Sequence, residues 1–349
     1  MSTVLNAGVI GLGIISGGHL EKYKEHDRAR LYAICDNDPD WLPDAEKLYK
    51  PEKAFSDYRE MLEDPNLDAV SICLPTALHA QATIDALNAG KHVLCEKPMA
   101  LNADEARAMK AAADKSGKKL MISHNQRLEG NVLYLKELQN QGYFGDIYMM
   151  RIGWRRPMGI LPPAFETRPN GKQYNRNFFN EKDNGGGVLR DLGSHLLDLS
   201  MFITDFPSPV ATVSSLYRKF YNPDVDLTKY PCDSEDMAVA QITFDNGLTM
   251  QLEFSFVSHI AEDTVLTEIY GTKAGASRRG QTLKLIEYEE KTTTTVIKPK
   301  PYPLPSKFPQ TCFIDSVLDD TPVPITAAEG IKVIEVLDAI YKAAGDVKL

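Results

Sequence analysis

One short stretch of the sequence places reactive side chains where core packing does not require them. The stretch KHVLCEKPMA runs from Lys91 to Ala100, and its apolar part is followed at once by Glu96, Lys97 and Pro98. Buried charges are costly and proline interrupts a strand, so packing does not explain this ending. A lysine there could bond a substrate hydroxyl or polarise a carbonyl, whereas the alternative is a Lys-Pro surface turn. We predict a cis bond before Pro98, because the chain must turn sharply to aim Lys97.

A second stretch, GGGVLRDLGSHLLDL, places an acid and a base at helical spacing. Asp191, His195 and Asp198 stand at i, i+4 and i+7, which is one stripe of a helix. Histidine is the natural base for a hydroxyl proton near neutral pH, and a carboxylate on the same face would orient it. The alternative is a satisfied core histidine. A metal pair lacks support, because the sequence has no HExxH motif and no third clustered ligand.

The early sequence GVIGLGIISGG has the form of a phosphate-binding loop. It gives Gly11-x-Gly13-x-x-Ser16 directly after a strand-like run, so backbone N–H groups could approach a pyrophosphate at a helix start. Serine at the third position is a mild departure, and the motif alone is weak. Asp36 strengthens it, because it ends the next predicted strand 23 residues after Gly13, where a carboxylate accepts hydrogen bonds from ribose hydroxyls. The alternative is a glycine turn without a ligand.

The same carboxylate predicts which dinucleotide binds. Asp36 would repel a 2′-phosphate, and the segment DNDPD offers no neighbouring arginine or lysine to receive one. We therefore predict NAD as the cofactor, with NADP less favoured.

Strand–helix alternation over residues 1–124 predicts the fold that positions these groups. Thr76 and Asn102 suit helix N-caps, Asn102 with Glu105 in a capping box, and Gly117 suits a left-handed helix stop. Such alternation indicates right-handed βαβ units and a doubly wound parallel sheet. The predicted strands are Ala7–Ile10, Leu31–Cys35, Ala69–Cys73, His92–Cys95 and Lys119–Ile122.

The carboxyl edge of such a sheet is where doubly wound folds hold their ligands. Pro75 and Thr76 follow the third strand there, and Lys97 follows the fourth. His79 lies one turn into the next helix, and we interpret it as a helix-face histidine near the cofactor, with a catalytic role as the alternative.

The alternation stops near residue 125, so residues 125–349 are predicted to form a second domain. An irregular piece from Arg155 to Gly187 has the length of a functional or mobile loop. In AQITFDNGLTMQLEFSF, Asn246-Gly247 suits a two-residue type I′ turn between strands. Period-two alternation after it predicts an antiparallel sheet with one face buried and one available to another subunit. The alternating residues are Met250, Leu252, Phe254 and Phe256, and the expected helices are Glu129–Gln141, Leu192–Ile203 and about 327–344, the last packing back on the first domain.

Composition limits the partners and the compartment. The 349 residues favour two domains, and a net charge of −9 with a pI near 5.4 argues against nucleic acid and anionic membranes as partners. No apolar run reaches the roughly 18 residues of a membrane span, and the N-terminus lacks a signal pattern, so we expect a cytoplasmic protein. Five cysteines form no CxxC pair, so reduced, packed thiols are expected, with neither disulfides nor a metal site.

Together these motifs resemble the glucose–fructose oxidoreductase / inositol dehydrogenase / rhizopine-catabolism (Gfo/Idh/MocA) family. The ending PVPITAAEGIKVIEVLDAIYKAAG is similar to the family's C-terminal segment, so the resemblance covers essentially the whole chain. It implies an N-terminal Rossmann domain and a C-terminal α/β domain whose large, open, mainly antiparallel sheet often mediates dimers or tetramers. The matching motifs are Gly11-Leu12-Gly13, Pro75-Thr76 with His79, Glu96-Lys97-Pro98 and Asp191-Leu192-Gly193-Ser194-His195.

The family resemblance implies NAD(P)-dependent oxidation or reduction of a hydroxyl-bearing carbon of a sugar, cyclitol or sugar derivative. His195 would take the hydroxyl proton, Asp191 would bind substrate or orient the base, and Lys97 would stabilise the developing alkoxide. The expected cofactor contacts are Gly11, Gly13, Ile14, Ile15, Asp36, Asn37, Leu74, Pro75, Thr76, His79, Glu96, Lys97 and Asn125. The expected substrate contacts are Lys97, Arg127, Trp154, Arg155, Asp191 and His195, with Arg156, Arg168 and Tyr174 as further candidates.

Three alternatives stay open. Asn125 and Arg127 could serve packing instead, and each loop arginine could be a solvated charge. Some relatives use tightly held NAD for redox-assisted glycoside cleavage, and others are non-catalytic dinucleotide sensors. The presence of Lys97, Asp191 and His195 argues against a sensor, because a sensor needs no base.

Overall fold

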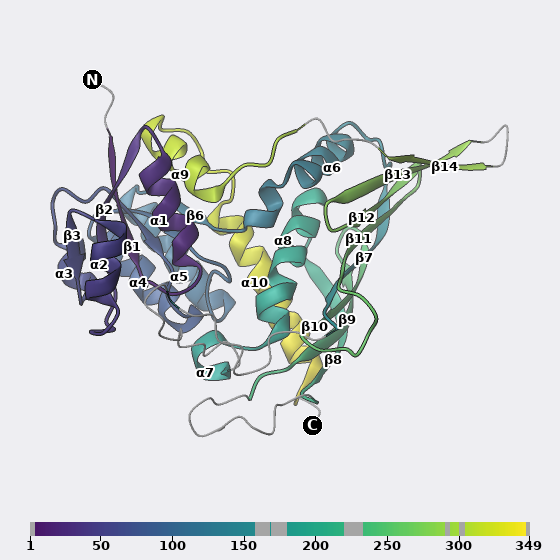
Figure 1. Ribbon diagram of the computed structural model, residues 1–349. Helices are drawn as coiled ribbons and strands as arrows, with labels where there is room; N and C mark the ends of the chain where they lie inside the picture. The colour runs from purple at the N-terminus through teal and green to yellow at the C-terminus, as the bar shows by residue number, and fades with distance from the viewer. Residues whose placement is uncertain are drawn as a thin grey trace. The chain divides into compact units, whose positions relative to one another are not determined.

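The computed structural model describes residues 4–157, 168, 180–219, 233–289, 294–299 and 304–346. These residues form two compact units (Figure 1). The first contains the described residues up to His124, together with Arg168 and residues 308–334. The second contains the described residues of 125–157, 180–307 and 335–346.

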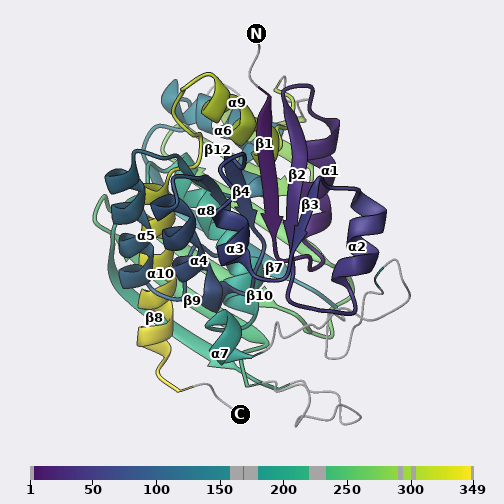
Figure 2. The same ribbon diagram turned by 90° about the vertical axis from the view of Figure 1, so that its left-hand side faces the viewer.

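The first unit is built on a parallel sheet. Its strands are β1 (Leu5–Ile10), β2 (Ala29–Cys35), β3 (Lys53–Phe55), β4 (Ala69–Ile72), β5 (His92–Cys95) and β6 (Leu120–Ile122). They pair in parallel in the order β3-β2-β1-β4-β5-β6, part of which Figure 2 shows side by side. The order reverses between β1 and β4, so the ligand crevice of this doubly wound sheet is expected at their carboxyl ends. The predicted fold class is confirmed, although β3 was missed.

Helices connect these strands, and two of the three predicted helix-end residues lie where the sequence placed them. The Asn102 side chain accepts from the Glu105 N–H at 2.9 Å, and Gly117 has φ 67°, as predicted. Thr76 was wrongly predicted as an N-cap. Pro75 takes that place with φ −56° and ψ 146°, so Thr76 is already the first helical residue. The helices of this unit are α1 (Ser16–Glu25), α2 (Leu42–Tyr49), α3 (Tyr58–Leu62), α4 (Thr76–Asn88), α5 (Ala103–Ser116) and α9 (Pro309–Leu318).

The second unit is built on an 8-stranded sheet. Its strands are β7 (Ile147–Arg155), β8 (Pro209–Tyr217), β9 (Met237–Phe244), β10 (Thr249–Ser255), β11 (Thr264–Gly271), β12 (Ala274–Arg279), β13 (Thr282–Glu289) and β14 (Thr294–Pro299). The order is β14-β13-β12-β11-β7-β10-β9-β8, and only the β7–β10 pair is parallel, so the sheet is mainly antiparallel as predicted.

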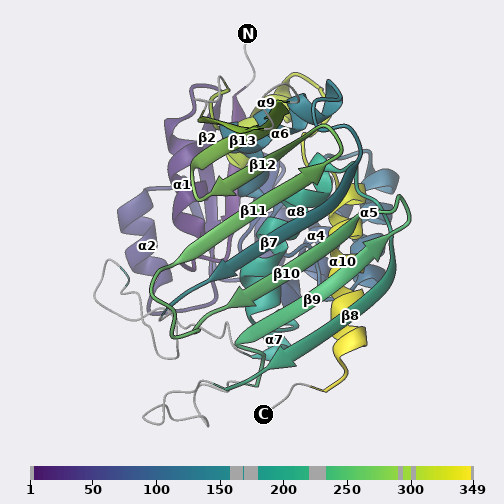
Figure 3. The ribbon, with the colours of Figure 1, turned by 90° about the vertical axis from the view of Figure 1, so that its right-hand side faces the viewer.

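One face of this sheet is covered and the other is not. The covered face buries Met250, Leu252, Phe254 and Phe256, as their alternation predicted. Figure 3 views the sheet from the opposite face, which carries none of the described helices. The other helical elements are η1 (Asn125–Leu128, a 3-10 helix), α6 (Gly130–Asn140), α7 (Glu181–Asn184), η2 (Leu189–Gly193, a π-helix), α8 (Ser194–Ile203) and α10 (Ala327–Ala344).

The hairpin between β9 and β10 differs from the prediction. The Gly247 N–H donates to the Phe244 carbonyl at 3.0 Å and the Phe244 N–H donates to the Leu248 carbonyl at 2.9 Å, so the loop has three residues. Only Gly247 has a positive φ, 86°. This is a type I turn followed by a left-handed glycine, and the predicted two-residue I′ turn was wrong.

None of the described helices combines the length and apolarity that crossing a bilayer requires. Cys35, Cys73, Cys95 and Cys312 are free thiols, and the first three are buried, as expected. Cys232 lies outside the described residues.

Candidate active site

The glycine loop of the first unit lies at the carboxyl ends of β1 and β4. Gly11 has φ 86°, and a Cβ there would lie 2.7 Å from the Cys73 carbonyl oxygen, so only glycine fits this close approach. At Gly13 a Cβ would meet nothing within 4 Å, so the loop is open where a pyrophosphate would approach the start of α1. The loop therefore fits a dinucleotide.

Asp36 is held beside this loop as a hydrogen-bond acceptor. Its carboxylate accepts from the Leu12 N–H at 2.7 Å and from the Asp38 N–H at 2.9 Å. The half-buried side chain follows β2 directly. A carboxylate anchored at this position suits the two hydroxyls of an adenosine ribose.

An arginine, Arg168, does lie beside the segment DNDPD, contrary to the expectation from the sequence. Its guanidinium forms an ion pair with Asp38 and lies 5.3 Å from the Trp41 ring centroid. The hydrogen bond from Arg168 is the main reason that the pKa of Asp38 is lowered. Arg168 therefore lies by the predicted ribose site, a position that argues against the expected contact with substrate. It comes from 130 residues further along the chain, which no local pattern reveals.

His79 joins the turns that follow β4 and β5. Its ring nitrogens lie 2.8 Å from the carbonyl oxygens of Leu74 and Pro98. The ring is buried, and burial lowers the pKa of His79. Both ring nitrogens are thus engaged by backbone carbonyl oxygens, which suits a structural helix-face histidine better than a catalytic one.

Glu96 shows why a carboxylate ends a buried strand. Its Oε1 lies 2.9 Å from His19 Nε2, the other His19 nitrogen lies 2.8 Å from Ser71 Oγ, and the Lys97 N–H donates to Glu96 Oε2 at 3.2 Å. Burial is the largest influence and opposes ionisation, but the contacts with His19 and Ser123 and the nearby Lys97 charge together outweigh it, so the pKa of Glu96 is lowered. Glu96 anchors the turn from inside, while the Lys97 side chain is half-buried and the predicted cis bond to Pro98 is confirmed.

In the second unit, one buried helical segment leaves two reactive side chains accessible. Of residues 186–201, all of which the structure describes, only Asp191 and His195 are not buried. Asp191 belongs to η2, and π-helical turns of this kind are frequent at functional sites. A Cβ at Gly193 would lie 3.3 Å from the Phe254 ring, so glycine lets the segment pack closely on β10.

Asp198 does not share the role of Asp191, contrary to the predicted stripe. It is fully buried in an ion pair with Arg127, whose guanidinium lies 5.3 Å and 5.0 Å from the rings of Phe202 and Phe206. Arg127 is 1% exposed, so its geometry favours the packing role over contact with substrate. Asn125 is exposed on η1.

Trp154 and Arg155 point to opposite faces of β7. The Trp154 ring lies 6.3 Å from the His195 ring, and the Arg156 guanidinium lies 5.0 Å from the Trp154 ring. Arg155 instead pairs with Glu253 at 3.3 Å on the uncovered face of the sheet. This position argues against the expected substrate contact of Arg155, whereas Trp154 and Arg156 stay candidates. Tyr174 lies outside the described residues.

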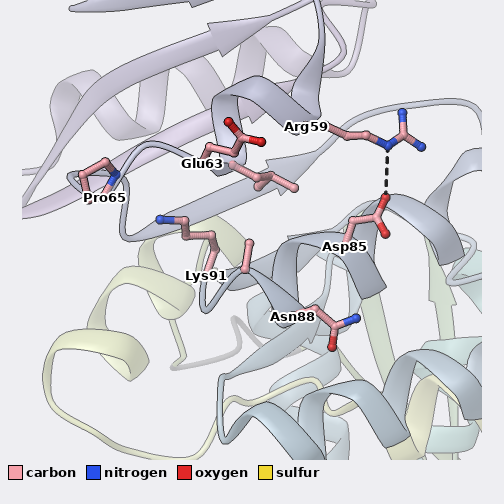
Figure 4. A pocket seen from close by; sticks show the side chains of 8 residues that line it. Arg59, Glu63, Pro65, Asp85, Asn88 and Lys91 are labelled. Carbon is pink, nitrogen blue, oxygen red and sulfur yellow. Dashed lines mark ion pairs between the residues drawn. The ribbon is translucent and has the colours of Figure 1, made fainter.

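A hollow of about 480 Å³ in the first unit lies elsewhere (Figure 4). Pro65 and Lys91 precede β4 and β5, so it opens at the amino-terminal edge of the sheet, away from the glycine loop. Its lining residues are Arg59, Leu62, Glu63, Pro65, Asp85, Asn88, Ala89 and Lys91.

Comparison with known families and proteins agrees with this arrangement. Residues 5–124 match the model described as "Oxidoreductase family, NAD-binding Rossmann fold", and residues 132–277 match the "GFO/IDH/MocA C-terminal domain". D-glucoside 3-dehydrogenase from Escherichia coli is 30% identical over 285 residues, which is 79% of this chain and 77% of that protein. Myo-inositol 2-dehydrogenase from Thermotoga maritima is 35% identical over 199 residues, which is 57% of this chain and 54% of that protein.

The fold is also that of solved structures. A levoglucosan dehydrogenase in complex with NADH superposes with a TM-score of 0.83 at 23% identity, covering 98% of this chain and 97% of that one. The matches to both domain models and to the E. coli enzyme establish that the chain belongs to the Gfo/Idh/MocA family of NAD-binding oxidoreductases.

Proposed function

We propose that the protein transfers a hydride between NAD and a hydroxyl-bearing carbon of a sugar, cyclitol or sugar derivative. The observation that carries this proposal is the accessible pair Asp191 and His195 on an otherwise buried segment, in a chain with an NAD-type loop and Asp36. Known relatives with this chemistry include the D-glucoside, myo-inositol and levoglucosan dehydrogenases. The test is a screen for NAD reduction over cyclitols, aldoses, uronic acids and deoxy sugars. No reduction with any class would contradict the proposal.

His195, Asp191 and Lys97 have different tasks in this reaction. NAD, when bound, supplies a nicotinamide C4 that exchanges a hydride with the substrate carbon. The neutral His195 ring takes the hydroxyl proton, and Asp191 binds the substrate or orients that ring. The Lys97 ammonium stabilises the substrate oxygen as its negative charge grows.

We further propose that Trp154 and Arg156 contact the substrate. An aromatic ring suits the apolar face of a sugar, and Trp154 lies beside His195. Arg156 would add a preference for an acidic sugar, since its guanidinium lies over the Trp154 ring.

The Asp36 carboxylate should make the protein prefer NAD to NADP. NAD should bind roughly tenfold more tightly than NADP or better, because a 2′-phosphate beside this carboxylate costs about 1.4 kcal/mol or more. Fluorescence titration with each dinucleotide measures the ratio of the NAD and NADP affinities. Asp36→Ser combined with Asn37→Arg should bring the two affinities closer together. Equal affinities in the parent protein would contradict the assignment of Asp36 as the residue that selects NAD.

We propose that the protein works in the cytoplasm as a homodimer or homotetramer. The free thiols suit a reducing compartment. The uncovered face of the sheet carries Val213, 75% exposed, beside charged pairs such as Arg155–Glu253, a mixture that suits a subunit interface. Val213→Asp should shift light scattering at micromolar concentration toward a smaller species, whereas the same change at Leu48, an exposed side chain on α2, should not. A monomeric parent protein would contradict the assembly.

A further inference from the structure

Three successive backbone amides at the start of η2 are bonded to one residue, Glu235. Its carboxylate accepts from the Gly187 N–H at 2.8 Å and from the Leu189 N–H at 3.0 Å. Its own carbonyl oxygen accepts from the Val188 N–H at 3.1 Å. The first amides of a helical segment have no partner inside it, so these bonds fix where the segment begins.

Tyr341 holds the same carboxylate through its side chain. The phenol O–H donates to Glu235 Oε1 at 2.8 Å, and Glu235 is 1% exposed. Burial raises the pKa of Glu235 although the amides and the phenol oppose that shift. With these three donors the buried carboxylate is fixed in one orientation.

The glycine run before η2, which the proposed reaction does not use, is what admits this contact. A Cβ at Gly186 would lie 2.0 Å from the Tyr341 hydroxyl oxygen, and one at Gly187 would lie 1.9 Å from the Glu235 carbonyl oxygen. On its other side the Gly187 carbonyl accepts from the Asp191 N–H at 3.0 Å. One residue, Gly187, thus connects Glu235 to the backbone of Asp191.

We propose that Glu235 is a positioning residue that holds Asp191 and His195 in the geometry for proton transfer. This inference rests on the proposed function. The new element is that the alignment of Asp191 and His195 depends on Glu235, which lies far along the chain, just before β9. Loss of one acceptor would let the start of η2 shift, and shifts of about 1 Å in an active site cost on the order of a hundredfold in rate.

The experiment compares three variants with matched chemistry. Glu235→Gln replaces one acceptor oxygen by a donor and should lower kcat roughly 10- to 100-fold, with NAD affinity within about twofold of the parent value. Tyr341→Phe removes the phenol donor but leaves both Glu235 carboxylate oxygens to accept from the two amides, and it should lower kcat about threefold or more. This variant replaces Glu235→Gln as the test if Glu235→Gln does not fold. Glu287→Gln is the control, because Glu287 also accepts from a tyrosine, Tyr143, in the same unit. Its kcat should stay within about twofold, whatever its melting temperature.

Hydrogen exchange of peptides covering residues 186–196 provides a readout that needs no substrate. Exchange should accelerate there in Glu235→Gln and not in Glu287→Gln. Unchanged exchange, or parent kcat in a folded Glu235→Gln, would overturn the positioning role. If none of the tested sugars or cyclitols lets the parent protein reduce NAD, the proposed function fails. The hydrogen-exchange result alone then decides whether Glu235 holds residues 186–196.

Discussion

Replacing His195 by alanine should lower turnover by roughly 10²–10⁴-fold, because the hydroxyl proton then has no positioned acceptor. In the oxidation direction only the neutral ring can accept that proton, so the parent rate should fall as pH drops through the histidine range. The variant should lose this limb of the pH–rate profile. NAD affinity should change little, because the glycine loop and Asp36 belong to the other unit. Steady-state kinetics across pH, beside a fluorescence titration with NAD, measures both effects.

A histidine outside the predicted site provides the control for this variant. His26 lies 3.7 Å from Asp315 in the first unit, and His26→Ala should keep the parent turnover. If His195→Ala turns over at the parent rate with an unchanged pH profile, the base is misassigned. Lys97 would then be the better candidate for the base.

Replacing Lys97 by alanine should lower kcat by roughly 10²–10³-fold for a different reason. The ammonium stabilises an oxygen whose negative charge grows toward the transition state, so its loss raises the barrier more than it weakens binding. The variant should keep the histidine limb of the pH–rate profile that His195→Ala loses. It should also bind NAD within about threefold of the parent affinity, since Lys97 is not among the groups that hold phosphate or ribose. Comparing both profiles separates the two roles.

A surface lysine serves as the control for Lys97. Lys110 pairs with Asp114 along α5, and Lys110→Ala should leave kcat unchanged. A Lys97→Ala protein whose kcat stays near the parent value while KM rises would show that Lys97 only binds substrate.

Local sequence signals were enough to predict most of the first unit. The strand His92–Cys95 was predicted with its observed ends, because an apolar run bounded by charge and proline is a strong signal. β3 was not predicted because it has three residues, too few to show an alternation of apolar and polar side chains. Asn246-Gly247 located the β9–β10 hairpin correctly, but the same pair also fits the last two positions of a three-residue loop.

In the candidate active site, too, local features were predicted from the sequence and contacts between distant residues were not. Asp191 and His195 could be found from spacing along one helix, and the cis bond at Pro98 from its turn. The ion pairs of Arg168 with Asp38 and of Arg127 with Asp198 join residues 130 and 71 positions apart, and no local pattern encodes them.

Two further contacts show what the sequence did and did not signal. The orientation of Arg155 was predictable, because neighbours in a strand point to opposite faces and Trp154 faces His195. Glu235 gave no signal beyond an acidic residue before a strand.

The most direct test of the proposed hydride transfer follows the hydrogen that moves. The best substrate from the screen would be prepared with deuterium on the carbon that bears the reacting hydroxyl, and the reduced cofactor analysed by mass spectrometry. Hydride transfer predicts one deuterium per NADH formed, with NADH accumulating in step with the oxidised product. Product formed without net NADH, as in cleavage of a nitrophenyl glycoside, or NADH that carries no deuterium, would contradict hydride transfer from a sugar or cyclitol carbon as the function of this protein.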